Sequence, residues 1–512
     1  MSEVENTPRR RERARAPRST AFALPPRLPA RIENPFPPVD LFSSGDVERI
    51  VDAAYTILER GGVEIWSAVA RAIYRDAGAE VNDETGLVRL PRAFVRDACA
   101  PAPETFVLHA RNPERDLHVG GRVVNFGPVN GAPNVTDLER GRRYGDIAAF
   151  RDLLKITHAL GVLHWQGGVV VEPVDLPVPT RHLDMYEAHI ACSDIVWAAR
   201  GVGGTQARDA IAMSAIEHGT TPAGLAARPT LLTVTNVNSP RRVDAEILDG
   251  IMAMAEAGQC VCVTPFTLMG AMAPITLPGA LAQQTAEALA VIALVQTIRP
   301  GCPSAIGGFT SNVDMRTGAP AFGTPDYVLA TLGGAQIARY LRIPYRGSAV
   351  NASPAADAQA TWETGLSLWA SIMSHTHLIN HACGWLEGGL SASFEKLAID
   401  AEMLRGWAAI LHRTSFSDAD LAVDAICEVP PGGHFFGAAH TIARYETAFW
   451  RPILSDWSNF ENWRDAGAKD ATMRAHVLWK NALAAYEAPP LDPAVREEVT
   501  DYAVRRRAEL LA

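Results

Sequence analysis

The segment SNVDMRTGAPAFGTPDYV, residues 311–328, carries polar side chains between two apolar stretches. Asn312, Asp314 and Arg316 alternate along it and offer an amide, a carboxylate and a guanidinium group to a bound molecule. The sequence TPD at 324–326 then predicts a helix start, because threonine caps helices and proline suits their first turn. Long loops inside compact domains are usually functional, so we expect Asn312 and Asp314 in a site.

The elements that must position this loop follow a regular order from about residue 122 onward. Short apolar runs typical of buried strands alternate with longer patterns of helical periodicity, and the polar loop follows the sixth run. Eight strand–helix units over about 290 residues predict a (β/α)8 TIM barrel rather than an open sheet. Such a barrel builds its site from the loops that follow its strands. The runs span residues 123–127, 162–167, 195–200, 230–236, 260–266, 303–309, 345–350 and 378–384.

Three further parts surround the predicted barrel, which we place at residues 122–411. Residues 1–40 are rich in proline and arginine and predict a flexible or surface-wrapping arm. Residues 41–121 carry amphipathic helical patterns and predict an N-terminal cap. Residues 412–512 predict a C-terminal helical extension, whose many aromatic side chains suggest packing across the barrel or against another subunit of a homo-oligomer.

The composition of the 512 residues, 48% of them hydrophobic, indicates a soluble globular protein with a large core. A net charge of -10 argues against a general nucleic-acid binder, which needs clustered basic side chains. The apolar stretch at 284–298 is too short and too amphipathic to span a membrane. No apolar signal segment follows Arg9 and Arg10, and seven cysteines without a CxxC pair suit a reducing cytoplasm.

Three motifs occur together in this chain: SNVDMRTGAPAFGTPD in the polar loop, HACGWLEGGLSASFEKLAIDAEML at 381–404, and HFFGAAHTIARYETAFWRPILSDW farther on. With them, the sequence resembles the trimethylamine:corrinoid methyltransferase superfamily from about residue 40 to the C-terminus. The resemblance implies a barrel that transfers a methyl group from a methylated amine to Co(I) of a separate corrinoid protein. The cobalamin cofactor would then be supplied by that partner and not bound by this chain. Trimethylamine-specific members carry pyrrolysine, and this sequence shows none, as in the glycine betaine methyltransferases.

The missing pyrrolysine favours a quaternary ammonium substrate. Its fixed positive charge already makes the amine a good leaving group, whereas trimethylamine needs activation. A cation without N–H groups is held mainly by aromatic faces, and we expect Phe126, Trp165, Phe309 and Trp385 to provide them. Phe266 is a further strand-end candidate, and Trp197, inside an apolar run, is more typical of a core residue.

A betaine would also present a carboxylate, which amide and guanidinium groups bind. We expect Asn236, Asn312 and Arg346 to bind substrate, with Asn238 and Arg316 as further candidates.

Demethylation of a quaternary nitrogen needs no general base. We therefore assign Asp314, Glu387 and His381 positioning and electrostatic roles in catalysis. His164 is a further candidate for contact with the substrate or the corrinoid.

Two other motifs point to different chemistry. Asp116, His118 and Gly121 match the DxHxxG pattern by which corrinoid proteins bind cobalt, but no flavodoxin-like series follows, so we interpret the match as chance. His375 and His377 precede His381 in an H-x-H-x3-H cluster that is typical of a metal-dependent barrel hydrolase.

The first two histidines of that cluster stand at the amino end of the eighth run, opposite to where barrels hold catalytic ligands, so we expect no metal site. The hydrolase remains one alternative, and a non-catalytic quaternary-amine binding protein is the other.

Overall fold

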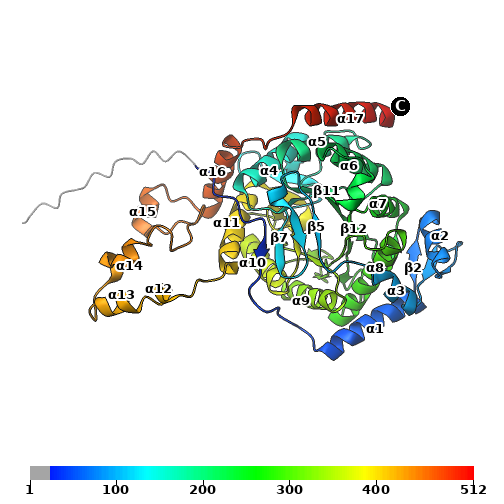
Figure 1. The fold of residues 1–512 in the computed structure, drawn as a ribbon, viewed down its shortest axis with the longest axis horizontal. Coiled ribbons are helices and arrows are strands. Elements are labelled where there is room, and N and C mark those ends of the chain that lie inside the picture. Colours follow the sequence, from blue (N-terminus) through cyan, green and yellow to red (C-terminus); the bar gives the residue numbers. More distant parts are fainter. Residues whose placement is uncertain (1–22) are drawn as a thin grey trace, which may run out of the picture.

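The computed structural model describes residues 23–512, so the basic cluster at 9–18 lies outside the described part of the chain. The protein has an α/β fold, in which helices surround a large curled sheet (Figure 1). The strands of this sheet are Ile32–Glu33 (β1), Val123–Phe126 (β7), Trp165–Gln166 (β10), Val196–Ala199 (β11), Leu231–Val237 (β12), Cys260–Pro265 (β14), Ser304–Gly307 (β16), Tyr345–Ser348 (β19) and Leu378–Asn380 (β20). Their order is β1-β7-β20-β19-β16-β14-β12-β11-β10.

Each of the eight predicted runs contains one strand of this sheet, which confirms the predicted alternation. Neighbouring strands from β7 to β10 pair in parallel, whereas β1 pairs antiparallel with β7. The backbone N–H of His164, next to β10, donates to the carbonyl of Phe126 in β7 at 2.9 Å. The two ends of the parallel series therefore approach each other, and the carboxyl ends of its strands face the same side.

A helix follows each parallel strand along the chain. The helices are Ile147–Leu160 (α4), Arg181–Cys192 (α5), Gly204–Glu217 (α6), Ala245–Glu256 (α7), Leu277–Ile298 (α8), Pro325–Tyr340 (α9), Ala358–Met373 (α10) and Phe394–Leu411 (α11). The Thr324 hydroxyl accepts a hydrogen bond from the N–H of Tyr327 at 3.3 Å, which confirms the helix start predicted at TPD. Among the described helices, α8 alone is long and apolar enough to cross a membrane, and 89% of its apolar stretch is buried inside the protein.

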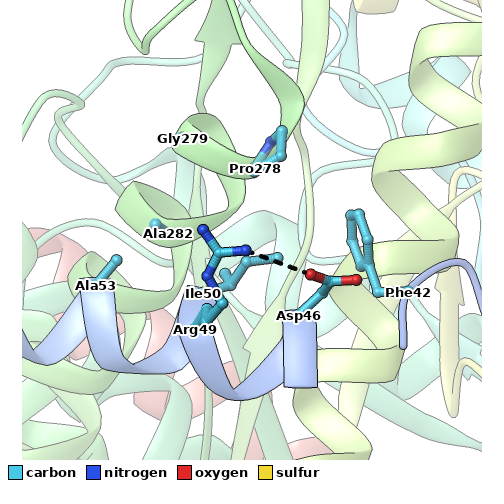
Figure 2. A pocket seen from close by; sticks show the side chains of 8 residues that line it. All are labelled: Phe42, Asp46, Arg49, Ile50, Ala53, Pro278, Gly279 and Ala282. Carbon is cyan, nitrogen blue, oxygen red and sulfur yellow. Dashed lines mark ion pairs between the residues drawn. The ribbon is translucent and has the colours of Figure 1, made fainter. Parts of the chain in front are cut away.

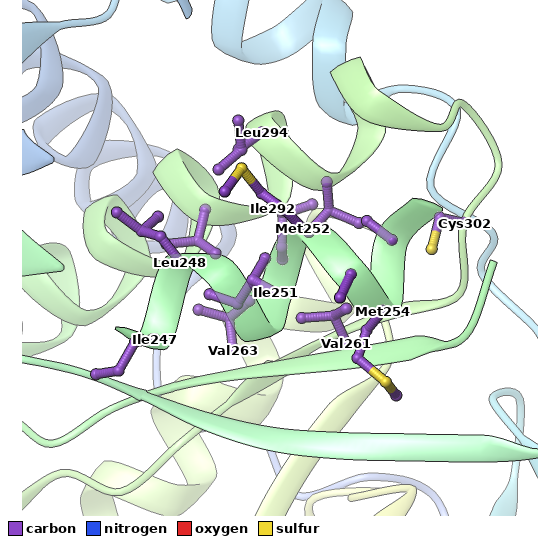
Figure 3. Packing of buried hydrophobic residues seen from close by; sticks show 14 of the residues in the cluster. Ile247, Leu248, Ile251, Met252, Met254, Val261, Val263, Ile292, Leu294 and Cys302 are labelled. Atoms are coloured by element: carbon purple, nitrogen blue, oxygen red, sulfur yellow. The ribbon is translucent and has the colours of Figure 1, made fainter. Parts of the chain in front are cut away.

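The main apolar core lies between the sheet and its outer helices. Figure 3 shows the part where α7 and α8 cover β14. Val261 and Val263 of β14 contact this core, with Ile251 of α7 and Ile292 of α8, and all four are buried. Burial of each such side chain contributes roughly 1.5–3 kcal/mol. Because side chains alternate along a strand, Cys262 between the two valines points to the inside of the curled sheet.

The inside of the sheet is closed on one side by a hairpin of β5 (Phe106–Leu108) and β6 (Leu117–Val119). Apolar side chains of this hairpin share one buried cluster with Trp165, Leu232 and Leu378, which come from three strands of the large sheet. Side chains from separate strands can meet in this way only when they point inward. Trp165 therefore belongs to the packed interior beside the hairpin.

The remaining elements flank the large sheet. Before β7, the chain forms Ser44–Arg60 (α1), Ala68–Asp76 (α2) and Arg92–Cys99 (α3), and the strands Val63–Ile65 (β2), Glu80–Val81 (β3) and Leu87–Arg89 (β4). These strands form a small sheet of order β13-β2-β4-β3 with Arg242–Val243 (β13), which follows β12 in sequence. After α11 come Asp418–Leu421 (α12), Val423–Glu428 (α13), Ala439–Ile442 (α14), Phe460–Asp465 (α15), Ala471–Ala484 (α16) and Pro493–Leu511 (α17). Residues 23–40 wrap the surface, where β1 joins the sheet. The division into domains stays a prediction.

Candidate functional site

The polar loop after β16 forms a hairpin at the carboxyl ends of the strands. β17 (Ser311–Val313) and β18 (Pro320–Ala321) pair antiparallel, and β17 also pairs in parallel with β15 (Leu268–Met269), which follows β14. Phe322 comes directly after β18 and is buried. The hairpin therefore places the Phe322 ring at the strand ends. The sequence did not predict Phe322 as a site residue.

Five rings form a contiguous group at these strand ends: Phe266, Phe309, Phe322, His381 and Trp385, here called the aromatic group. The ring centroid of Phe309 lies 5.1 Å from that of Phe266, 5.2 Å from Phe322, 5.6 Å from His381 and 6.3 Å from Trp385. The rings of His381 and Trp385 are 4.0 Å apart. Because the rings follow three different strands, only the folded sheet brings them together. Such a group can hold a cation on its ring faces.

A buried arginine lies beside the aromatic group. Arg346 of β19 is 2% exposed, and its guanidinium carbon lies 5.5 Å from the centroid of the Phe309 ring. Its Nε and Nη1 atoms have no hydrogen-bond partner among the residues that the structure describes. Burial lowers the pKa of Arg346, and the groups that oppose this shift are Cys262, Tyr327 and Tyr345 rather than a carboxylate. A buried cation without a counterion is costly, so this position suits an anionic group.

His381 adds a neutral ring next to this cation. Burial, and then the charge of Arg346, hold its pKa well below the usual histidine value. The Asn380 amide nitrogen lies 3.3 Å from Nε2 and can only donate, so Nδ1 carries the proton and donates to the Ser348 hydroxyl at 3.1 Å. A neutral imidazole presents an aromatic face without repelling a bound cation.

Trp385 is held at two points by Asn351. The indole N–H donates to the Asn351 carbonyl at 3.1 Å, and the Asn351 amide donates to the Trp385 carbonyl at 2.6 Å. The same amide also donates to the Thr364 hydroxyl at 3.0 Å. Trp385 lies in β21 (Trp385–Leu386), which pairs with β22 (Ser391–Ser393) just before α11.

A buried ion pair supports this arrangement from α11. The Lys396 ammonium pairs with the Asp400 carboxylate and donates to the Thr364 hydroxyl at 3.0 Å. Asp400 also accepts the backbone N–H of Gly384, next to Trp385, at 2.9 Å. Both charged side chains are at most 1% exposed. The pair therefore ties the segment that carries Trp385 to α10 and α11.

The predicted aromatic residues do not all lie together. Phe309 and Trp385 belong to the aromatic group, and Trp165 lies in the interior beside the β5–β6 hairpin. Phe126 pairs with Ile379, the residue after the inward-pointing Leu378, so its ring points to the outer helices. Trp197 lies in the outer layer, where its indole N–H donates to Glu217 at 2.8 Å. Phe126 and Trp197 point away from the inside of the sheet, which a strand end alone does not show.

Asp314 and Asn312 bond within the loop between β16 and α9. Asp314 is exposed and accepts the backbone N–H of Arg316 at 3.0 Å and the Thr317 hydroxyl at 2.7 Å. These bonds lower the pKa of Asp314. Asn312 accepts the hydroxyl of Thr324 at 3.2 Å. Both side chains thus stabilise the shape of the loop. Asp314 does this at the turn of residues 314–317.

The other predicted polar residues lie nearer the surface than Arg346. Glu387 forms an ion pair with Arg142 at 2.8 Å, with 28% of its side chain exposed. Asn236 is exposed near the end of β12, and the Asn238 amide donates to Asp244 at 2.9 Å. Of the predicted polar residues, His381 therefore belongs to the aromatic group, and Arg346 lies against its Phe309 ring.

Two histidines that stood out in the sequence support neighbouring strands. His164 accepts the N–H of Phe126 at 3.1 Å and His377 that of Tyr345 at 3.0 Å, each through Nδ1. Each donates from Nε2 to a backbone carbonyl. Burial lowers the pKa of His164 to about 3 and that of His377 to about 4. These contacts give both imidazoles a structural role.

His377→Asn is expected to flatten the pH dependence of stability between about pH 6.5 and 4. The unfolded chain takes up a proton at the ordinary pKa of about 6.5, whereas the folded chain keeps His377 neutral down to about 4. The unfolded state then binds more protons, so stability is present above this window and is lost as the pH falls. The loss from this residue reaches on the order of 3 kcal/mol at the lower end.

Urea unfolding of wild type and variant across this pH range measures the difference. Wild type and variant share all other titrating groups, so their contributions to the pH dependence cancel in the comparison. Glu217, whose pKa is raised by burial, is one such group with the opposite effect. Parallel pH profiles for the two proteins would contradict the expectation.

The other residues of the two motifs, His375, Asp116 and His118, make hydrogen bonds with other parts of the chain. His375 donates to the Phe36 carbonyl at 2.9 Å, and Asp116 pairs with His109 at 2.7 Å. His118 lies in the β5–β6 hairpin, and its carbonyl accepts the Asn125 amide at 2.8 Å. Within residues 23–512, no three His, Cys, Asp or Glu side chains are grouped to hold a metal ion.

A surface groove of about 490 Å³ lies between α1 and the first turns of α8 (Figure 2). Phe42, Ile50 and Pro278 give it an apolar lining, and Arg49 pairs with Asp46 at 3.6 Å along its edge. The groove lies among the outer helices and is lined by none of the five rings of the aromatic group.

Known proteins are similar to this chain in sequence and in fold. A family model described as trimethylamine methyltransferase (MTTB) matches residues 7–511. The chain is 32% identical over 475 residues to the glycine betaine methyltransferase of Desulfitobacterium hafniense strain Y51, with 93% of this chain and 98% of the relative covered. It is 29% identical over 459 residues to the trimethylamine methyltransferase MttB of D. hafniense strain DSM 10664 / DCB-2, with 88% and 90% covered.

Among solved structures, the hydroxylamine complex of MtmB has a TM-score of 0.50 at 10% identity, covering 91% of this chain and 95% of that one, a likeness of fold alone. The family model and the sequence relatives together define a methyltransferase. The chain belongs to the trimethylamine methyltransferase family, which confirms the resemblance seen in its motifs.

Proposed function

We propose that this methyltransferase demethylates a short betaine, a quaternary ammonium compound with a carboxylate, such as glycine betaine or proline betaine. One observation carries the proposal: the buried, unpartnered guanidinium of Arg346 lies 5.5 Å from the Phe309 ring at the centre of the aromatic group. A short zwitterion satisfies both features, because its charges are separated by only a few bonds. The name of the 32% identical relative supports the same substrate class.

The residues divide the binding between them. The substrate carboxylate accepts charge-assisted hydrogen bonds from Arg346. It thereby serves as the counterion of a guanidinium that has no hydrogen-bond partner in the free protein. The methylated nitrogen lies against the faces of Phe309 and Trp385, where a cation–π contact with a desolvated cation is worth about 2 kcal/mol. The neutral His381 completes the wall without repelling the cation.

The chemistry then requires orientation more than proton transfer. The bond between nitrogen and one methyl carbon breaks, its electron pair stays on nitrogen, and a neutral tertiary amine results. The methyl group passes to Co(I) of a separate corrinoid protein, the partner that we propose. No proton moves, so the fixed position of the substrate between Arg346 and the rings is the main contribution of this chain.

We further infer that the eight parallel strands form a closed (β/α)8 barrel and that the aromatic group lies at its mouth. The hydrogen bond from His164 to Phe126 supports closure. We also infer a cytoplasmic location, because the cysteines among residues 23–512 are free thiols, as a reducing compartment keeps them.

The test is a comparison of substrates with free cob(I)alamin, and then a reduced corrinoid protein, as methyl acceptor. Glycine betaine or proline betaine is expected to be demethylated, and trimethylamine is not. Choline keeps the quaternary nitrogen but lacks the carboxylate, so it is expected to react about 10- to 150-fold less efficiently, the value of a charged hydrogen bond.

Efficient demethylation of trimethylamine would contradict the proposal. Binding of betaines without methyl transfer to either acceptor would instead indicate a binding protein.

A further inference from the structure

Asn380, the last residue of β20, has a buried side-chain amide next to the aromatic group. The residue is 0% exposed, and its Nδ2 atom lies 3.3 Å from Nε2 of His381. Its Oδ1 atom has no hydrogen-bond partner within residues 23–512. An amide oxygen has two acceptor positions, and leaving a buried acceptor without a partner is costly. This oxygen therefore suits contact with a bound molecule.

The strand register places this amide on the inner side of the curled sheet. Leu378 points inward, where it shares a buried cluster with the β5–β6 hairpin. Alternate residues of a strand lie on the same face, so Asn380 points to the same side as Leu378. Ser348 of β19 is the register partner of Asn380, and its hydroxyl bonds to Nδ1 of His381. Asn380 therefore lies on the inner side, where β20 ends.

Arg346 faces the same side from the neighbouring strand. It pairs in register with Leu378, so the backbone of Asn380 lies about 6.6 Å nearer the carboxyl ends of the strands. The Nε and Nη1 donors of Arg346 and the Oδ1 acceptor of Asn380 all lack a partner among the described residues, so the two side chains do not bond each other. Unmet donors and an unmet acceptor on one side of the sheet suit a molecule with an anionic and a cationic end.

The cationic end of a betaine can contact an amide oxygen although it has no N–H group. The positive nitrogen polarises the C–H bonds of its methyl groups, which then form weak C–H···O hydrogen bonds. Neutral methyl groups of the same shape gain much less from such an oxygen. An inward-facing amide oxygen therefore favours a quaternary nitrogen over a quaternary carbon.

We propose that Asn380 determines specificity in the betaine site, because its Oδ1 atom contacts the methyl groups on the quaternary nitrogen. This inference rests on the proposed function. The substrate carboxylate lies toward Arg346, and the methylated nitrogen lies nearer the carboxyl ends of the strands, among the rings of the aromatic group. The carboxylate is then deeper in the sheet than the methyl group that is transferred.

Calorimetric binding of two ligands of the same shape tests the proposal. One is glycine betaine, and the other is the anion of tert-butylacetic acid, which has the same carboxylate but a quaternary carbon in place of the nitrogen. Wild type is expected to bind glycine betaine more tightly. Asn380→Leu keeps the volume but removes the oxygen, so the ratio of the two Kd values is expected to fall about 5- to 30-fold, as the loss of two weak C–H···O contacts predicts.

Asn380→Asp is the matched variant. It keeps an oxygen acceptor at the same position and removes the Nδ2 donor next to His381. The ratio of the Kd values is therefore expected to stay as in wild type or to rise. Any competition of the introduced carboxylate for Arg346 weakens both ligands, because both carry a carboxylate, and so cancels in the ratio. A ratio that falls equally in both variants would show that Asn380 acts only through His381 and would overturn the proposal.

An unchanged ratio in Asn380→Leu would also overturn the proposal and would indicate that a buried water satisfies the oxygen. Melting by circular dichroism checks that the variants fold, and Asn380→Ala removes the same oxygen with the same expected loss if the leucine variant does not. A wild type that binds neither ligand, or both equally, would contradict the proposed function itself. A wild type that prefers glycine betaine as strongly as the leucine and alanine variants do would contradict only the role of Asn380.

Discussion

Arg346→Met is expected to lower kcat/KM for a betaine by about 30-fold to several thousand-fold. Loss of one partner of a buried charge pair costs about 2–5 kcal/mol, and the betaine carboxylate would lose its counterion. The free energy of unfolding is expected to stay the same or to rise, because methionine replaces a buried cation that has no partner in the free protein. Demethylation kinetics and urea unfolding of the same preparations measure both effects.

Choline provides the internal control for this variant. It has no carboxylate, so its slow demethylation is expected to be unaffected by Arg346→Met. Arg346→Lys keeps the charge without the planar pair of donors and is expected to recover part of the betaine activity. An equal loss for choline and betaine would show that Arg346 acts through the fold rather than through the carboxylate.

Lys396→Met is expected to lower the free energy of unfolding by about 3–5 kcal/mol, the cost of a buried charge left without its partner. Lys396 and Asp400 are both buried, and Asp400 has few other donors to satisfy it. Burial raises the pKa of Asp400 even with the lysine present, so the variant is expected to lose more stability at alkaline pH than at acidic pH. Chemical unfolding at several pH values measures the effect.

The double variant Lys396→Met with Asp400→Leu is the control. Replacing both charges by apolar groups of similar size is often nearly neutral, so most of the lost stability is expected to return. If the double variant is as unstable as the single one, the cost comes from packing, and the ion pair is not what holds the Trp385 segment.

The local pattern of the sequence was enough to predict many of the elements. Each of the eight apolar runs contains a strand, and α9 begins at the Thr-Pro-Asp sequence. These features depend on neighbours along the chain, through hydrophobic periodicity and helix capping. The motifs likewise predicted the family, which the relatives confirm.

The sequence did not predict whether each strand side chain points to the inside of the sheet or to the outer helices. A strand buried on both faces is apolar at nearly every position, so its sequence does not show which residues point inward. Phe126 lies in β7 and Arg346 in β19, and both strands are buried at every position. Yet Phe126 faces the outer helices, whereas Arg346 lies beside the aromatic group. Both residues had been expected from the sequence to bind substrate.

The sequence by itself determined the order of strands and helices, the family, and the strand-end positions of Phe309, His381 and Trp385. Only the tertiary structure decided that these three rings meet Phe322 and an unpartnered Arg346, and that Trp165 lies in the interior instead. The physical reason is distance along the chain. Periodicity and capping act over a few residues, whereas the site is assembled by parallel strand pairing and side-chain packing between segments far apart in sequence.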